Sequence, residues 1–151
     1  MSMRPSSVPE PRQSPVENFR RQHADLLALA AEIGGRLTPE RVAAEAAEVR
    51  RLLAQFAGKL NVHARMENDA LYPRLLEHAD QAVRRQAEEL LSEVDGVYDA
   101  FGALLKAWPT AASIAAAPSD FIRQATKVFR VLGKRMLREE HQLYPLVEAA
   151  P

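Results

Sequence analysis

A seven-residue phrase that could carry metal chemistry occurs twice in this chain, as ENDALYP over residues 67–73 and as EEHQLYP over residues 139–145. Each copy places a carboxylate one helical turn before a Leu-Tyr pair, and the proline that follows disturbs the helix. Each copy also lies where a long amphipathic segment is about to end. The two repeated carboxylates, Glu67 and Glu139, are therefore the first candidates for chemistry.

The residue four positions before each carboxylate distinguishes the two copies. His63 precedes Glu67 by four residues, so an imidazole and a carboxylate share one helix face about one turn apart, which suits a metal ion. The corresponding residue before Glu139 is Arg135, whose guanidinium keeps its positive charge and cannot ligate a metal at neutral pH. The sequence therefore indicates either a metal protein or a protein that has lost half of its metal site.

Four amphipathic helices are predicted to position these side chains. The first has a typical start, with Ser14 as cap, Pro15 in the first turn and Glu17 at the third position. Apolar residues recur at helical spacing along each segment, including Leu27 on the first helix and Val62 on the second. The predicted helices cover residues 14–34, 38–73, 80–108 and 119–145, with Ser119 as the last cap and residues 110–117 as a small-residue linker.

The predicted fold class is all-α. No segment alternates polar and apolar residues with a period of two, so strands are not expected. Mostly short connections force successive helices to run antiparallel, which predicts an up-down-up-down four-helix bundle over residues 14–149. The Pro- and Ser-rich segment 1–13 cannot bury enough apolar area to order itself, and we predict a disordered tail there.

Polar residues interrupt the apolar stripes at positions that face the bundle interior. His23 falls four residues after Phe19 and three before Leu26, which places it on the inner face of the first helix. The stripes of the second and fourth helices likewise continue through His63, Glu67 and Glu139. Two carboxylates that face each other in a low dielectric cannot both stay ionised unless a positive charge neutralises them. A metal ion or Arg135 can supply that charge.

Composition excludes several classes of function. The chain has 151 residues with 47% hydrophobic content, which makes one ordinary domain with a single core. Its 20 basic and 20 acidic residues give no net charge, so neither nucleic acid nor an acidic membrane surface is an expected partner. The chain has no cysteine, and thiolate metal sites and cysteine nucleophiles are therefore excluded. With neither an apolar leader nor a membrane-spanning stretch, a cytoplasmic location is expected.

Three segments resemble the hemerythrin-like (HHE) cation-binding domains, namely RRQHADLLAL, HARMENDALYPRLLEHAD and REEHQLYPLVEAA. The resemblance covers roughly residues 15 to 149. It implies a four-helix bundle that holds two bridged iron ions between its helices. It also implies that His23 and His63 hold one iron, while Glu67 and Glu139 are the bridging carboxylates.

The other half of the implied site departs from the family pattern. Histidine ligands are expected on the third helix, where Val94 and Tyr98 stand, and on the fourth helix, where Arg135 stands. These three changes together remove the ligands of one iron. Our hypothesis is that Arg135 places its guanidinium near the lost metal position and bridges Glu67 and Glu139, because its fork suits carboxylates.

Two descriptions of the function remain open. The first is a hemerythrin-like bundle with a remodelled site, which acts as a non-catalytic binding or signalling module and has lost di-iron oxygen binding. The alternative is a mononuclear iron, manganese or zinc sensor or storage domain that uses the surviving half-site, with Glu89 and Glu93 as further donors. The expected cofactor is accordingly none or one divalent metal ion, iron first. An enzyme is not expected, because the chain has no Glu-x-x-His pair, no paired nucleophile and base and no phosphate-binding glycine loop.

The sequence leaves the partners open. A protein partner, a second copy of the chain, or a small apolar ligand beside Val94 and Tyr98 are each compatible with it. Tyr72 and Tyr144 are interpreted as aromatic residues that close the end of the bundle by packing. A histidine phosphotransfer role would require one of the inward-facing histidines to be exposed.

Overall fold

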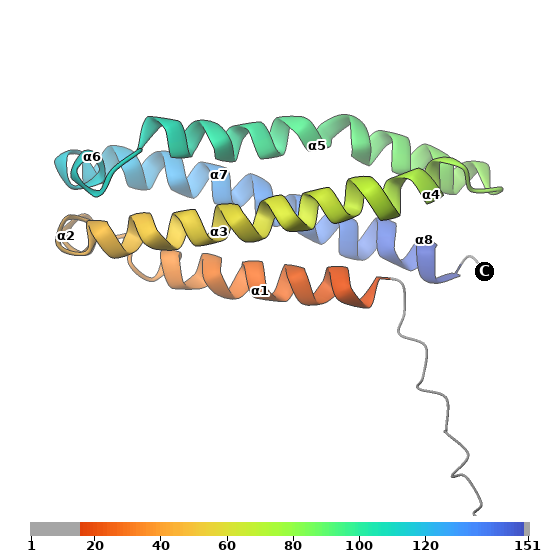
Figure 1. The fold of residues 1–151 in the computed structure, drawn as a ribbon, viewed down its shortest axis with the longest axis horizontal. Coiled ribbons are helices and arrows are strands. Elements are labelled where there is room, and N and C mark those ends of the chain that lie inside the picture. The colour runs from red at the N-terminus through yellow and green to blue at the C-terminus, as the bar shows by residue number, and fades with distance from the viewer. Residues whose placement is uncertain (1–15, 150–151) are drawn as a thin grey trace, which may run out of the picture.

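Four long helices lie side by side along the length of the molecule (Figure 1). A computed structural model describes residues 16–149, apart from the side chain of Asp95. The long helices are α1 (Glu17–Gly34), α3 (Ala46–Met66), α5 (Gln81–Ala107) and α7 (Pro118–Arg138). Both α1 and α5 pack against α3 and α7, which closes the bundle, and no strand occurs in residues 16–149. The all-α bundle predicted from the sequence is confirmed, whereas the predicted tail 1–13 and the Ser14 cap lie outside the described residues.

Shorter helices lie at the two ends of the bundle (Figure 1). They are α2 (Pro39–Ala44), α4 (Tyr72–Leu76), α6 (Ala111–Ala116) and α8 (Tyr144–Ala149). The second predicted helix is divided, because the backbone leaves the helical region at Glu45 (φ −113°, ψ 27°) between α2 and α3. None of the described helices is both long and apolar enough to cross a membrane.

The predicted linker at residues 110–117 is wrong. A capping box forms there, in which the side chains of Thr110 and Ser113 each accept a hydrogen bond from the other's backbone N–H. This box starts α6, and Ile114 on that helix is completely buried. Pro118, rather than a Ser119 cap, then opens α7, because the proline ring fixes a φ that suits the first helical turn.

Both copies of the repeated phrase contain a π-helical turn, η1 (Glu67–Leu71) and η2 (Glu139–Leu143). The Tyr72 N–H donates to the carbonyl of Glu67, and the corresponding bond follows η2. A proline after the tyrosine has no N–H, and its ring would clash with the carbonyl four residues earlier in an α-helix, so a wider turn relieves the conflict. The helix is therefore disturbed as predicted, but it continues beyond Pro73 as α4.

The apolar interior has two clusters. The larger one, with Leu26, Phe56 and Leu60, fills the middle of the bundle and the end near α2 and α6. The smaller one, with Phe19 and Leu71, lies toward α4 and α8. His23 and His63 fall between residues of the two clusters in sequence, so the buried polar groups lie where the clusters meet. Two expected stripe residues are instead exposed, Leu27 at 46% and Val62 at 57%.

Candidate metal centre

The structure brings together the four residues that the sequence singled out. His23 comes from α1, His63 from the last turn of α3, and Glu67 and Glu139 open the two π-turns. None of these residues is more than 2% exposed. One donor atom from each lies within 4.8 Å of the others.

The two imidazoles face each other through nitrogens that carry lone pairs. The Nε2 atoms of His23 and His63 are 3.0 Å apart. The Nδ1 atom of His63 is 2.6 Å from Oε1 of Gln22, and that of His23 is 3.2 Å from Oε1 of Glu140. Because an amide or carboxylate oxygen only accepts, each Nδ1 carries the ring hydrogen. In the neutral rings, Nε2 is then an acceptor, and the two acceptors repel unless a positive centre lies between them.

Around the carboxylates, too, hydrogen-bond acceptors outnumber the hydrogens available to them. Oε1 of Glu67 lies 2.6 Å from Nε2 of His63. The Tyr144 hydroxyl is within hydrogen-bond distance of Glu67 (2.8 Å), Glu139 (3.3 Å) and Nε2 of His23 (3.2 Å), but it has one hydrogen for these three acceptors. Oε2 of Glu67 is buried, and no donor group among residues 16–149 lies within hydrogen-bond distance of it. The centre therefore requires either a cation or additional protons.

Burial shifts the pKa values in this centre toward the uncharged forms. Burial lowers the pKa of His23 and of His63, so both rings are neutral near pH 7, which is the form that binds metals. Burial raises the pKa of Glu67, and burial together with the neighbouring carboxyl of Glu67 raises that of Glu139 to about 8. Without a cation, the carboxyl pair therefore holds a proton at neutral pH.

Arg135 fills the opposite side of the cluster and is only 4% exposed. Its Nε donates to Oε1 of Glu139 (3.2 Å), one terminal nitrogen to the carbonyl of Leu90 (2.6 Å), and the other to the hydroxyl of Tyr72 (2.7 Å). The expected bridge between Glu67 and Glu139 is not formed in the part of the chain that the structure describes. Glu67 lies on the histidine side and accepts from Tyr144 instead.

The arrangement of buried histidines and carboxylates agrees with the comparison of this chain with known families. The Hemerythrin HHE cation binding domain matches residues 14–147. This chain belongs to the hemerythrin family. No curated protein and no solved structure gives a significant match.

The residues present fit a single ion of the kind that the hemerythrin family binds. Two imidazole nitrogens and two carboxylates suit iron, manganese or zinc. Donors at about 2.1 Å from one ion lie about 3.0–3.4 Å from each other in octahedral or tetrahedral geometry. The observed separations, 2.6 and 3.0 Å to His63 and 3.9 Å between His23 Nε2 and Glu67 Oε1, bracket that range. Small side-chain shifts would bring these atoms around one ion.

The third-helix positions that lack the expected hemerythrin ligands differ in how closely they are tied to the centre. Val94 on α5 is buried. Burial raises the pKa of Tyr98, and the negative charge of Glu67 raises it further, which places this phenol near the carboxylates. The proposed further donors Glu89 and Glu93 are exposed on the outside of α5, where Glu93 is ion-paired with Arg138.

Four polar residues of this hemerythrin-family centre were not anticipated from the sequence. Tyr72 and Tyr144 were expected only to pack, yet their hydroxyls join the polar network because the π-turns rotate them inward. The repeated proline was the available signal for this widening. Gln22 and Glu140 orient the histidines from positions next to His23 and Glu139 in the sequence, and their residue types alone gave no signal.

Proposed function

We propose that this domain binds one divalent metal ion through His23, His63, Glu67 and Glu139 and acts as a non-catalytic binding or signalling module. The observation that carries the proposal is the 3.0 Å separation of two imidazole nitrogens whose partner nitrogens already hold the ring hydrogens. A cation between these nitrogens converts a repulsion into two ligand bonds. Gln22 and Glu140 fix both rings in the orientation that such an ion requires.

We further propose that Arg135 replaces the second ion of a di-iron centre, so that two-iron oxygen binding is lost. Its guanidinium is buried and donates three hydrogen bonds, including one to Glu139. A permanent positive charge at this position repels a second cation. Val94 supplies no donor atom on the facing helix.

Iron is the first choice of ion, with manganese and zinc as alternatives, because imidazole and carboxylate donors accept all three. The ion would supply a charge that holds both carboxylates ionised and, if it is iron, a redox-sensitive centre. The protein would keep the donors neutral or anionic, orient the rings, and exclude water. A sensor or storage role for one metal ion follows from these properties.

The test is the metal content of protein expressed in iron-supplemented medium, measured by elemental analysis together with an absorption spectrum. We expect about one metal ion per chain, and loss of that ion in His63→Ala, because one of four donors is removed. His141→Ala is the matched control, since His141 is exposed. Two irons per chain with oxo-bridge absorption would contradict both proposals.

A second candidate is a metal-free module, and the closure of the Arg135 side favours it. There, the fold satisfies a buried carboxylate without any ion. A groove of about 340 Å³ beside Val94, lined also by Tyr72, Pro73 and Leu91, would suit a small apolar ligand in that case. Absence of metal in a correctly folded wild-type protein would support this candidate over the first.

A further inference from the structure

A cation must cross a layer of helices to reach the buried donors. On the seam between α5 and α7, the buried guanidinium of Arg135 occupies that crossing. Arg135 lies inside the seam and Arg138, ion-paired with Glu93, lies outside it. The seam between α1 and α3 is on the other side of the bundle and brings His23 and His63 together.

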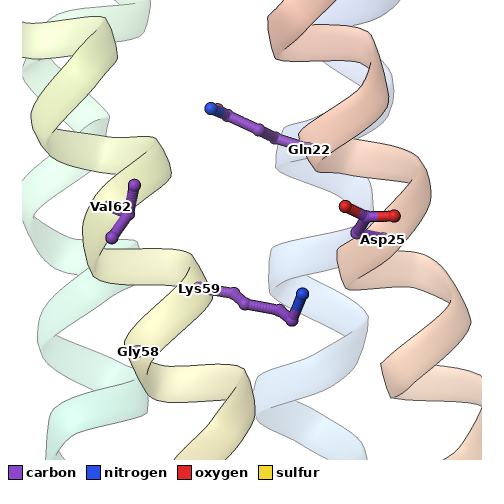
Figure 2. A pocket seen from close by; sticks show the side chains of 5 residues that line it. All are labelled: Gln22, Asp25, Gly58, Lys59 and Val62. Carbon is purple, nitrogen blue, oxygen red and sulfur yellow. The ribbon is translucent and has the colours of Figure 1, made fainter.

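A hollow of about 270 Å³ lies between α1 and α3 next to the centre. Figure 2 shows the side chains of Gln22 and Lys59 reaching into the space between the two helices. The residues that line the hollow are Gln22 and Asp25 from α1 and Gly58, Lys59 and Val62 from α3. Since one water molecule takes about 30 Å³ of liquid, the hollow can hold a cation with part of its water shell.

A hydrogen bond connects a side chain of this hollow to a donor ring. Gln22 lines the hollow, and its Oε1 accepts from Nδ1 of His63 at 2.6 Å. Its amide nitrogen contacts the sulfur of Met66 at 3.0 Å, and a thioether is a weak acceptor on a flexible side chain. Rotation of Gln22 therefore breaks one strong hydrogen bond and exposes the ring of His63 to the hollow.

The charges at the hollow act on a cation in opposite directions. The carboxylate of Asp25 attracts it, while the ammonium of Lys59 repels it. Both groups lie at the surface, so salt screens their effect.

We propose that the hollow between α1 and α3 is the access site through which a hydrated divalent cation reaches the centre, with Asp25 as its first contact and Gln22 as the gate. This inference rests on the proposed metal binding. It assigns roles to Gln22 and Asp25, which lie outside the donor set.

The first test fills the hollow and measures the rate of Co²⁺ uptake by the metal-free full-length protein, followed by stopped-flow absorption, and the rate of Co²⁺ release to EDTA. An added Cβ at Gly58 meets no atom within 4 Å, so Gly58→Phe places its ring in open space at the hollow. We expect both rates to fall by about tenfold with an unchanged equilibrium Kd, because access changes and the donors do not. Gly96→Phe is the matched control, since Gly96 also has open space and lies exposed on α5.

The second test changes the charges and the gate. Asp25→Asn should slow uptake and Lys59→Gln should accelerate it, each by about threefold to tenfold at low salt and less at high salt. Asp120→Asn, which removes an exposed carboxylate at the start of α7, should leave the rate unchanged. Gln22→Ala should accelerate both uptake and release.

The outcomes separate this inference from the function on which it rests. Normal Co²⁺ binding with equal rates in Gly58→Phe, Asp25→Asn and the controls overturns the access site and leaves the metal centre intact. A weaker equilibrium affinity in Gly58→Phe that comes from faster release alone, with an unchanged uptake rate, also overturns it. A wild-type protein that binds no Co²⁺ overturns the proposed function, and the access site with it.

Discussion

The two copies of the repeated phrase have the same backbone conformation, but the negative charge of their buried glutamates is balanced in different ways. Each contains a π-turn, a buried glutamate at its start and a buried tyrosine after it. One turn earlier, the first copy has His63 and the second has Arg135. The histidine side presents lone pairs that require either a cation or additional protons, while the arginine side carries its own cation. The fold therefore determines that the carboxylates are buried, and one residue per copy determines how their charge is balanced.

The tyrosines connect the two copies. The Tyr72 hydroxyl accepts a hydrogen bond from Arg135, four residues before the second copy, and the Tyr144 hydroxyl donates to Glu67 of the first copy. A substitution in one copy therefore changes the hydrogen bonds of the other. The comparison can be tested by removing the balancing charge, the connecting hydroxyls and finally the protons.

Removing the guanidinium should have the largest effect. Arg135→Met leaves Glu139 without its buried cation, and breaking a buried pair costs about 3–5 kcal/mol. We expect the free energy of unfolding of the metal-free protein to fall by this amount, measured by urea denaturation.

The control for this change is Arg138→Met, which removes an arginine from a partly exposed ion pair. It should cost no more than about 1 kcal/mol, because exposed pairs contribute little. A melting temperature of Arg135→Met within a degree of the wild type would show that Arg135 does not balance the centre.

The inward direction of the donor side chains could be predicted because helical periodicity alone determines it. His23 lies between Phe19 and Leu26 at spacings that share one face, and its complete burial follows. Tyr144 is completely buried, as its interpreted packing role requires, but α-helical spacing does not reveal that its hydroxyl reaches the carboxylates. A π-turn adds one residue to the turn and moves the tyrosine, five residues after the glutamate, onto the face of the carboxylates.

Hydrogen-bond and packing contacts between residues of different helices could not be predicted. The carbonyl of Leu90 accepts from Arg135 because α5 passes next to it, and nothing near either residue in the sequence records that proximity. The Ala-rich α6 was taken for a linker since its only large apolar residue is Ile114, whose burial depends on packing against α3.

Removing the connecting hydroxyls should have an intermediate effect that differs between the copies. Tyr72→Phe leaves a guanidinium N–H of Arg135 buried without an acceptor, and Tyr144→Phe removes the hydrogen that Glu67 accepts. Each should cost about 1–3 kcal/mol in the metal-free protein.

Metal should distinguish the two tyrosine variants. An ion at the histidine side replaces the hydrogen that Tyr144 supplied, so saturating Zn²⁺ should restore most of the lost stability in Tyr144→Phe. It should restore less in Tyr72→Phe, where the unsatisfied group is a donor on the arginine side. Equal recovery of the two variants, measured by urea denaturation with and without Zn²⁺, would contradict this division of the centre.

Changing the pH should have the smallest effect, and its sign is set by the carboxyl pair. The pKa of Glu139 is about 8 in the folded protein against an ordinary value of 4.5. Between pH 4.5 and pH 8, the folded state therefore binds a proton that the unfolded chain has released. Stability then falls as the pH rises through this range. The histidines change the stability in the opposite direction, and only below their ordinary pKa of 6.5. There, the unfolded chain binds protons that the buried rings of the folded chain do not bind.

Between pH 6.5 and 8, the carboxyl pair therefore dominates, and the free energy of unfolding of the metal-free protein should fall by up to about 1.4 kcal/mol per pH unit. Urea denaturation at half-unit steps measures this slope, and Glu139→Gln should flatten it. Saturating Zn²⁺ should remove or reverse the slope, because the ion holds both carboxylates ionised and competes with the protons. A slope that is the same with and without Zn²⁺ would mean that Arg135 alone balances both copies, and the distinction between a histidine side and an arginine side would then have no energetic content.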